Sequence, residues 1–177
     1  LLLKNIGFRD EALLKTLWKQ HVAKIKNKEI KKKLDFYLHM PYCKTNCNFC
    51  VYASTTMKND GQVAAYLDTL LEQGSHFSDI FKGVKFDTFY MGGGTPSVFS
   101  TEQLDKLFSY IFSAYEFEEN AELSIELNPQ NVTLDKLKLL EKYKFNKISM
   151  GVQSLSSRVL KINNRMYQTK KMVEDAI

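Results

Sequence analysis

The sequence has no cysteine outside one eight-residue stretch, where Cys43, Cys47 and Cys50 follow a C-x3-C-x2-C spacing. An odd number of thiols does not make a disulfide framework, and a structural zinc site takes four ligands, usually as two separated pairs. Three thiolates on one short loop can instead hold three corners of a cubane iron–sulfur cluster, which leaves the fourth iron without a protein ligand. The alternative is three unrelated buried cysteines, which this close spacing disfavours.

Long apolar runs are also absent. No stretch approaches the ~20 apolar residues that cross a bilayer, so we expect no membrane span. The opening run of leucines, residues 1–3, is too short for a signal-peptide core and gives way to Lys4 and Asn5. We therefore expect the protein in a reducing cytoplasm, where thiolates remain available to metal.

The net charge of +5 is mild and largely local. Six lysines crowd one ten-residue stretch: Lys24, Lys26, Lys28, Lys31, Lys32 and Lys33. No aromatic residue lies between them, which disfavours binding to single-stranded nucleic acid. We interpret this run as a solvated helix end and linker, and we expect no nucleic-acid partner.

Strand-like and helix-like segments alternate along the chain. Apolar periodicity predicts strands over residues 34–40, 86–91, 121–127 and 147–152. Helices are predicted over residues 8–26 and 61–82, after Thr101 and Thr133 as N-caps, and from about Leu155. This alternation indicates βα units around a parallel sheet.

We expect an α/β fold, a partial (β/α) TIM-type barrel of about four βα units with an N-terminal helix. An eight-stranded barrel needs ~250 residues, so these units are too few to close one. Residues 1–33 are predicted to form the helix and a lysine-rich linker, and residues 34–177 the incomplete barrel core. The chain lacks an initial Met and stops inside a predicted helix, so we expect it to be a piece of a longer protein.

Polar or glycine-rich signals follow each predicted strand, and active sites of βα folds lie at that edge. Gly92–Gly94 and Thr95 would let a ligand approach bare backbone amides, although neither G-x-G-x-x-G nor a G-K-[ST] ending is present. Glu126 offers a carboxylate, Gln153 an amide and Arg165 a planar guanidinium. Each one alone is compatible with surface chemistry or a tight turn; together they are expected to converge on one cavity.

His39 lies two residues after Tyr37, so the two share one face of the first predicted strand. A metal ligand or an acid–base group is one interpretation of His39. We prefer a packed or hydrogen-bonded histidine.

Four motifs together resemble the radical SAM superfamily. They are Tyr-x-His-x-Pro-x-Cys-x3-Cys-x-Phe-Cys at 37–50, Gly-Gly-Gly-Thr-Pro-Ser at 92–97, Glu-x-Asn-Pro at 126–129 and Ser-x-Gly-Val-Gln-Ser at 149–154. More narrowly, they look like the oxygen-independent coproporphyrinogen III oxidase group. That group includes the true oxidases, HemW-type haem chaperones and anaerobic haem-degrading methyltransferases.

The resemblance implies a [4Fe–4S] cluster on Cys43, Cys47 and Cys50, whose remaining iron chelates S-adenosylmethionine. One electron delivered through the cluster then cleaves the sulfonium to methionine and a 5′-deoxyadenosyl radical, which abstracts hydrogen. The residues that the resemblance places around S-adenosylmethionine are Tyr37, Phe49, Gly93, Gly94, Thr95, Glu126, Gln153 and Arg165. It also implies a radical SAM oxidoreductase of porphyrin or haem metabolism, a tetrapyrrole substrate and an electron donor such as flavodoxin or ferredoxin.

One departure bears on the substrate. True oxidases tend to continue the third cysteine with Gly-Cys, whereas Val51 and Tyr52 follow Cys50 here. This difference disfavours strict coproporphyrinogen decarboxylation and favours the HemW-like or haem-degrading relatives. A structural zinc- or cluster-binding module stays open as a third interpretation.

Overall fold

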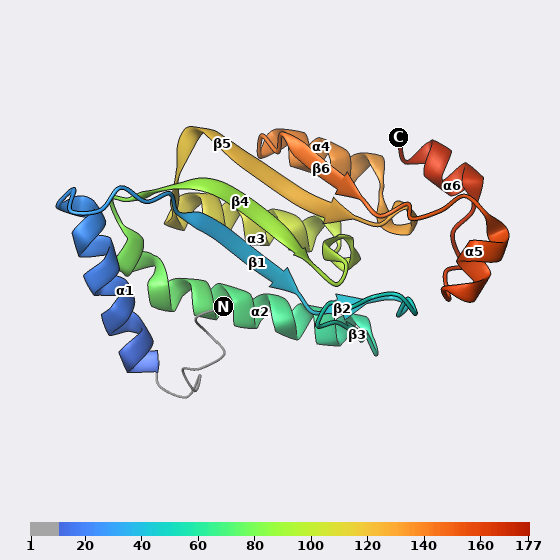
Figure 1. Cartoon of the computed structure of the whole chain (residues 1–177), viewed down its shortest axis with the longest axis horizontal. Coiled ribbons are helices and arrows are strands. Elements are labelled where there is room, and N and C mark those ends of the chain that lie inside the picture. Colours follow the sequence, from blue (N-terminus) through green and yellow to red (C-terminus); the bar gives the residue numbers. More distant parts are fainter. Residues whose placement is uncertain (1–10) are drawn as a thin grey trace.

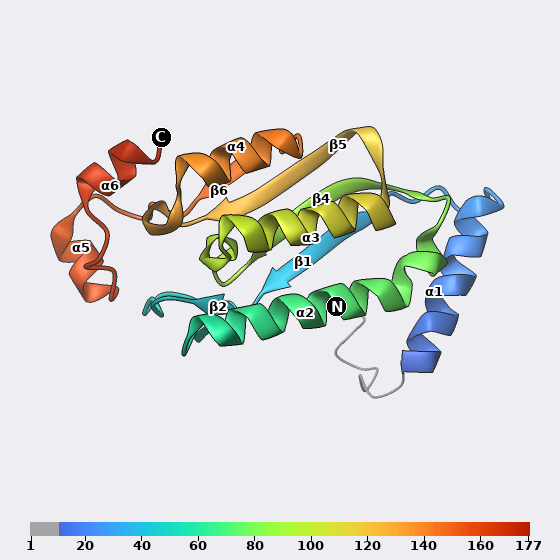
Figure 2. The same cartoon turned by 180° about the vertical axis from the view of Figure 1, so that it is seen from behind.

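Four parallel strands form one sheet in the computed structural model, which describes residues 11–177. The strands lie in the order β1 (Asp35–Met40), β4 (Lys85–Gly93), β5 (Glu116–Leu127) and β6 (Lys147–Met150). The connecting helices are α2 (Asp60–Phe81), α3 (Thr101–Ala114) and α4 (Leu134–Lys142), and they cover one face of the sheet (Figures 1 and 2). Each strand of the sheet neighbours the next one in sequence, as in a βα barrel, so the predicted α/β fold and partial barrel are confirmed.

The core lies between the sheet and its covering helices. Phe89 and Met91 of β4 and Phe108 of α3 are fully buried there, because alternate strand residues point to the helix side. On the opposite face Tyr37 and Tyr90 are 54% and 36% exposed. The sheet therefore has one apolar, covered face and one face on which polar and aromatic side chains remain accessible.

Helix α1 (Glu11–Lys26) packs against α2. The rings of Trp18 and Phe81 lie 5.3 Å apart, and Val22 is buried in the shared core. Residues 8–10 of the predicted helix lie outside the described residues. The lysines between residues 24 and 33 are exposed, as expected of a solvated linker, while the domain division at residue 33 stays a prediction.

Several element boundaries differ from those predicted. Strand β5 begins at Glu116 rather than residue 121, because Glu116 and Phe117 pair with Lys85 and Phe86 of β4. Helix α3 is capped by Ser100, not Thr101, whereas Thr133 caps α4 as predicted. The remaining elements are the two-residue strands β2 (Tyr42–Cys43) and β3 (Thr55–Thr56), the 3-10 helices η2 (Pro96–Val98) and η3 (Pro129–Asn131), and the helices α5 (Ser157–Ile162) and α6 (Lys170–Asp175). Among the helices of residues 11–177, none combines the length and hydropathy that crossing a membrane needs.

Candidate cofactor site

The cysteines lie on a loop that is closed at its base. After β1 ends, β2 (Tyr42–Cys43) pairs in parallel with β3 (Thr55–Thr56). The amide of Met57 donates to the Cys43 carbonyl at 2.8 Å. The loop that carries the three cysteines thus starts from a hydrogen-bonded base. Cys43 is buried, Cys47 is half-buried and Cys50 is exposed. Two-residue strands carry no periodicity, so the sequence did not reveal this base.

The glycine turn at the end of β4 packs closely against the base of the cysteine loop and forms hydrogen bonds with it. Gly93 has a φ of +108°, and a Cβ on Gly94 would lie 2.7 Å from the Tyr42 carbonyl oxygen. The amide of Gly94 donates to the Met40 carbonyl, and that of Thr95 donates to Tyr42 at 2.9 Å. These two amides are therefore used by the protein itself, so the expectation that a ligand approaches a bare amide is wrong for Gly94. The small residues instead let two backbone segments approach closely.

Two hydroxyl groups, those of Thr95 and Ser54, act on the Cys43 thiol. Thr95 Oγ1 donates to Cys43 Sγ at 3.3 Å. Burial raises the pKa of Cys43, while the hydroxyls of Thr95 and Ser54 act in the opposite direction. Because iron binds the thiolate form, these donors favour the ligating state of a buried sulfur.

The end of α5 and the residues that follow it form hydrogen bonds with the tip of the cysteine loop. The amide nitrogen of Asn48 donates to the carbonyl of Asn163 at 3.3 Å, and its side chain donates to the carbonyl of Ile162 at 2.8 Å. The side chain of Asn164 donates to the carbonyl of Asn46 at 2.8 Å. These bonds join residues more than a hundred positions apart, so the tip of the loop is fixed by tertiary contacts. We call these hydrogen bonds between residues 162–164 and residues 46–48 of the cysteine loop the clasp. Apart from the Asn-Asn-Arg run itself, nothing in the sequence predicted it.

Next to the clasp, Arg165 forms a hydrogen bond with a cysteine sulfur. It is 4% exposed, and its Nη1 donates to Cys47 Sγ at 3.4 Å. Its Nη2 donates to the Gly151 carbonyl at 2.6 Å and to Gln168 Oε1 at 2.8 Å. Nε is buried and has no hydrogen-bond partner in the part of the chain that the structure describes. Gln168, which the sequence analysis missed, donates in turn to the carbonyls of Val152 and Ser154.

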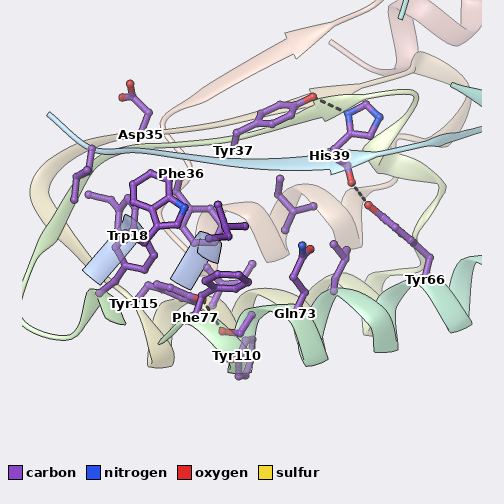
Figure 3. Close-up of a pocket in the computed structure, with 18 residues that line it drawn as sticks. Trp18, Asp35, Phe36, Tyr37, His39, Tyr66, Gln73, Phe77, Tyr110 and Tyr115 are labelled. Carbon is purple, nitrogen blue, oxygen red and sulfur yellow. Dashed lines mark hydrogen bonds between the residues drawn. The ribbon is translucent and has the colours of Figure 1, made fainter. Parts of the chain in front are cut away.

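The accessible face of the sheet carries a second polar group of residues. The Tyr90 hydroxyl donates to the Glu126 carboxylate, and Tyr37 stacks on Tyr90 with ring centroids 5.7 Å apart. Figure 3 shows the Tyr37 hydroxyl beside His39 Nδ1, at 2.8 Å. His39 Nε2 lies 3.0 Å from the Ala53 carbonyl; because a carbonyl only accepts, Nε2 is the donor of this hydrogen bond. The preferred interpretation of His39 as a hydrogen-bonded histidine is confirmed.

A cavity of about 470 Å³ lies at the carboxyl edge of the sheet, among the ends of β4, β5 and β6 and the cysteine loop. Tyr37 does not line it and lies instead beside a mainly apolar cavity of about 410 Å³ under β1, with Trp18 and Phe77 (Figure 3). Tyr167 and Asn128, joined by a 3.0 Å hydrogen bond, also line the first cavity. The sequence did not single out Tyr167, and Asn128 belongs to the Glu-x-Asn-Pro motif without a predicted role of its own. The residues predicted from sequence that do line this cavity are Cys43, Cys47, Cys50, Phe49, Gly93, Gly94, Thr95, Glu126, Gln153 and Arg165.

Within residues 11–177, no three His, Cys, Asp or Glu side chains converge on a position for a single metal ion. A cubane cluster makes a different demand, since each thiolate binds its own iron. Three sulfurs lining one cavity, hydrogen-bond donors to two of them and a buried guanidinium with no carboxylate partner among the described residues all suit a negatively charged cluster. The residues present therefore fit that group.

Comparison with known proteins agrees with this geometry, because the sequence matches the description "Radical SAM superfamily" over residues 37–176. The chain belongs to the radical SAM superfamily. A [4Fe–4S] cluster and S-adenosylmethionine are accordingly the cofactors of this radical SAM chain.

Its relatives within the superfamily include two functional groups. The chain is 33% identical to an oxygen-independent coproporphyrinogen III oxidase of Escherichia coli over 132 residues, 75% of this chain and 29% of that protein. It is also 33% identical to the heme chaperone HemW of Lactococcus lactis over 141 residues, 80% of this chain and 36% of that protein. The solved structure of the Escherichia coli coproporphyrinogen III oxidase HemN superposes with a TM-score of 0.81 at 30% identity, over 90% of this chain and 36% of that one. The radical SAM chain thus spans about a third of the length of these relatives.

Proposed function

We propose that the protein is a radical SAM enzyme of porphyrin or haem metabolism, with a tetrapyrrole as its substrate. The observation that carries this proposal is the convergence of all three cysteines with Glu126 and Gln153 on one cavity at the carboxyl edge of the sheet. The names of the relatives support the substrate class. When bound, the cluster and S-adenosylmethionine supply one-electron cleavage of a sulfonium to methionine and a 5′-deoxyadenosyl radical.

The chain's own residues then have separate tasks. Cys43, Cys47 and Cys50 hold three irons, while Glu126 accepts hydrogen bonds from ribose hydroxyls or an ammonium group. Gln153, whose backbone φ is +65°, presents its amide from a conformation that is unfavourable for a non-glycine residue and is often found at functional sites. Phe49, Gly93, Gly94, Thr95 and Arg165 complete the walls of the S-adenosylmethionine site. Tyr37 acts on this site indirectly, because it stacks on Tyr90, whose hydroxyl donates to Glu126.

An electron donor such as flavodoxin or ferredoxin is proposed to approach at Cys50, the exposed member of the set. The lysine run lies at the opposite end of the sheet from the cysteine loop (Figure 1). We therefore assign it no part in bringing the donor to the cluster. A reducing compartment, in which the three thiols stay available to iron, remains part of this proposal.

The test is anaerobic reconstitution with iron and sulfide, followed by reduction in the presence of S-adenosylmethionine. We expect an iron–sulfur absorption spectrum and release of 5′-deoxyadenosine. The absence of both would contradict the proposal. Tight zinc binding with no cluster would favour a structural module instead.

A haem chaperone that keeps the same cofactors is the second candidate. It is favoured by Val51 and Tyr52, 92% and 63% exposed, which follow Cys50 in place of the Gly-Cys expected of an oxidase. Tyr52 lines the cavity together with the three cysteines. Stoichiometric haem binding without porphyrinogen turnover would support the chaperone, and turnover or methyl transfer would support the enzyme.

A further inference from the structure

Arg165 is a buried cation without a carboxylate partner in the described part of the chain. Its side chain is 4% exposed, and its polar contacts are two carbonyl-type oxygens and one sulfur. Burying a positive charge is costly unless an anion compensates it. Of these contacts, the Cys47 thiol, 3.4 Å from Nη1, is the group that becomes an anion when it binds iron.

The guanidinium is held in place before any ligand arrives. Nη2 donates both to the Gly151 carbonyl and to Gln168 Oε1. Gln168 is itself 4% exposed, and its amide nitrogen donates to the Val152 and Ser154 carbonyls at 2.7 and 2.9 Å. Since the planar fork of arginine is rigid, fixing Nη2 also fixes the direction of Nη1. The turn after β6 therefore aims Nη1 at the cysteine loop.

We propose that Arg165 is a positioning residue that donates a hydrogen bond to the Cys47 thiolate of the bound cluster and raises the cluster's reduction potential. The inference rests on the proposed function, because it requires the cluster. Iron–sulfur potentials depend on net charge and on hydrogen bonds to the sulfurs. A fixed cation beside one thiolate stabilises the reduced, more negative cluster relative to the oxidised one, and so eases one-electron loading by a donor.

The same contact makes Arg165 a structural link. Together with Asn48 and Asn164, it connects the segment 162–165 to the cysteine loop. Removing a group that supports a metal ligand typically lowers metal affinity about 10–100-fold. Loss of the guanidinium is therefore expected to change two separable properties, cluster retention and cluster potential.

The experiment compares Arg165→Gln and Arg165→Lys with the wild-type protein after anaerobic reconstitution. Midpoint potentials are measured by redox titration followed by electron paramagnetic resonance, and cluster loss is timed under an iron chelator. We expect Arg165→Gln to shift the potential to more negative values and to lose iron about 10–100-fold faster. Arg165→Lys, which keeps the charge but not the fork, is expected to restore much of the potential and less of the retention.

Asn164→Gly is the matched control. It removes the hydrogen bond to the Asn46 carbonyl, and glycine suits the φ of +55° at this position. This substitution weakens the clasp but removes no contact to a cysteine sulfur. We therefore expect the cluster to lose iron faster while its reduction potential stays unchanged. A potential shift equal to that of Arg165→Gln would show that loop disorder, not the guanidinium, sets the potential.

If Arg165→Gln fails to fold, a measurement on the wild-type protein still tests the contact between Arg165 and the cluster. The chain has three arginines, Arg9, Arg158 and Arg165, so ¹⁵N-arginine labelling followed by pulsed electron paramagnetic resonance of the reduced cluster probes few positions. We expect a ¹⁵N coupling that persists in Arg158→Lys. An absent coupling, or an Arg165→Gln cluster with the wild-type potential, overturns this inference while cluster assembly and 5′-deoxyadenosine release leave the proposed function intact. Failure of the wild-type protein to assemble a cluster overturns both.

Discussion

The hydroxyl of Tyr90 donates a hydrogen bond to the carboxylate of Glu126, from one strand of the sheet to the next. The pKa of Tyr90 lies well above its usual value, chiefly because of burial and then because of the bond to Glu126. Tyr90 therefore remains a proton donor throughout the physiological pH range. The orientation of the cavity carboxylate is thus set by a residue that does not itself line the cavity.

Tyr90→Phe is expected to weaken S-adenosylmethionine binding by about 10–150-fold, because a hydrogen bond to a charged group contributes about 1.5–3 kcal/mol. Cluster content should not change, since no cysteine contacts Tyr90. Equilibrium binding to the reconstituted protein measures the effect. Tyr143→Phe is the control, because it removes a similar bond to a carboxylate, that of Asp105 at 2.6 Å, on α3. Equal affinities of the two variants would show that Tyr90 does not orient Glu126.

Gly93→Ala is expected to destabilise the protein by about 1–3 kcal/mol, the usual cost of a strained backbone conformation. The φ of +108° disfavours any side chain, and a Cβ would lie 2.5 Å from the His39 ring. Gly61→Ala is the control, since Gly61 lies in the first turn of α2 with only Asn59 Oδ1 nearby, at 3.2 Å. Urea unfolding should show Gly61→Ala at or above the wild-type stability. A wild-type midpoint for Gly93→Ala would contradict the positive φ.

Cys43→Ala, Cys47→Ala and Cys50→Ala should each abolish assembly of the four-iron cluster, because the chain has no further cysteine to replace a lost ligand. Iron and sulfide per chain, together with the absorption spectrum, measure the outcome. Ser54→Ala removes a hydroxyl that acts on Cys43 without being a ligand, so it is expected to load fully. A complete cluster in any one of the three cysteine variants would show that the ligand assignment is wrong.

The convergence of the site was predictable because parallel strands end at one edge of their sheet. Glu126 and Gln153 follow different strands, yet both line the cavity. The clasp between Asn48 and Asn163 was not predictable, since it joins segments whose proximity depends on the whole fold. The early start of β5 was missed for a related reason: pairing with β4 overrides the weak strand preference of acidic residues.

Ser100→Ala tests one place where the structure corrects the sequence prediction. The Ser100 hydroxyl accepts from the amide of Gln103 at 3.2 Å, and the Gln103 side chain accepts from the amide of Ser100 at 2.9 Å. Loss of such a cap costs about 1 kcal/mol. Thr101→Ala, the cap expected from sequence, should cost much less. Thermal unfolding that ranks the two variants in the opposite order would restore Thr101 as the cap.

Tyr66 provides a prediction about alkaline stability. Its hydroxyl donates to the His39 carbonyl at 2.6 Å, and burial raises the pKa of Tyr66 from 10.0 to about 12. Because the unfolded chain ionises first, the stability from Tyr66 is fully present below pH 10 and is lost as the pH rises through about 12. Tyr66→Phe should therefore be about 1 kcal/mol less stable at neutral pH, yet lose less stability than the wild type over that alkaline range. Urea unfolding at a series of pH values measures both effects, and parallel curves for the two proteins would show that Tyr66 ionises equally in the folded and unfolded states.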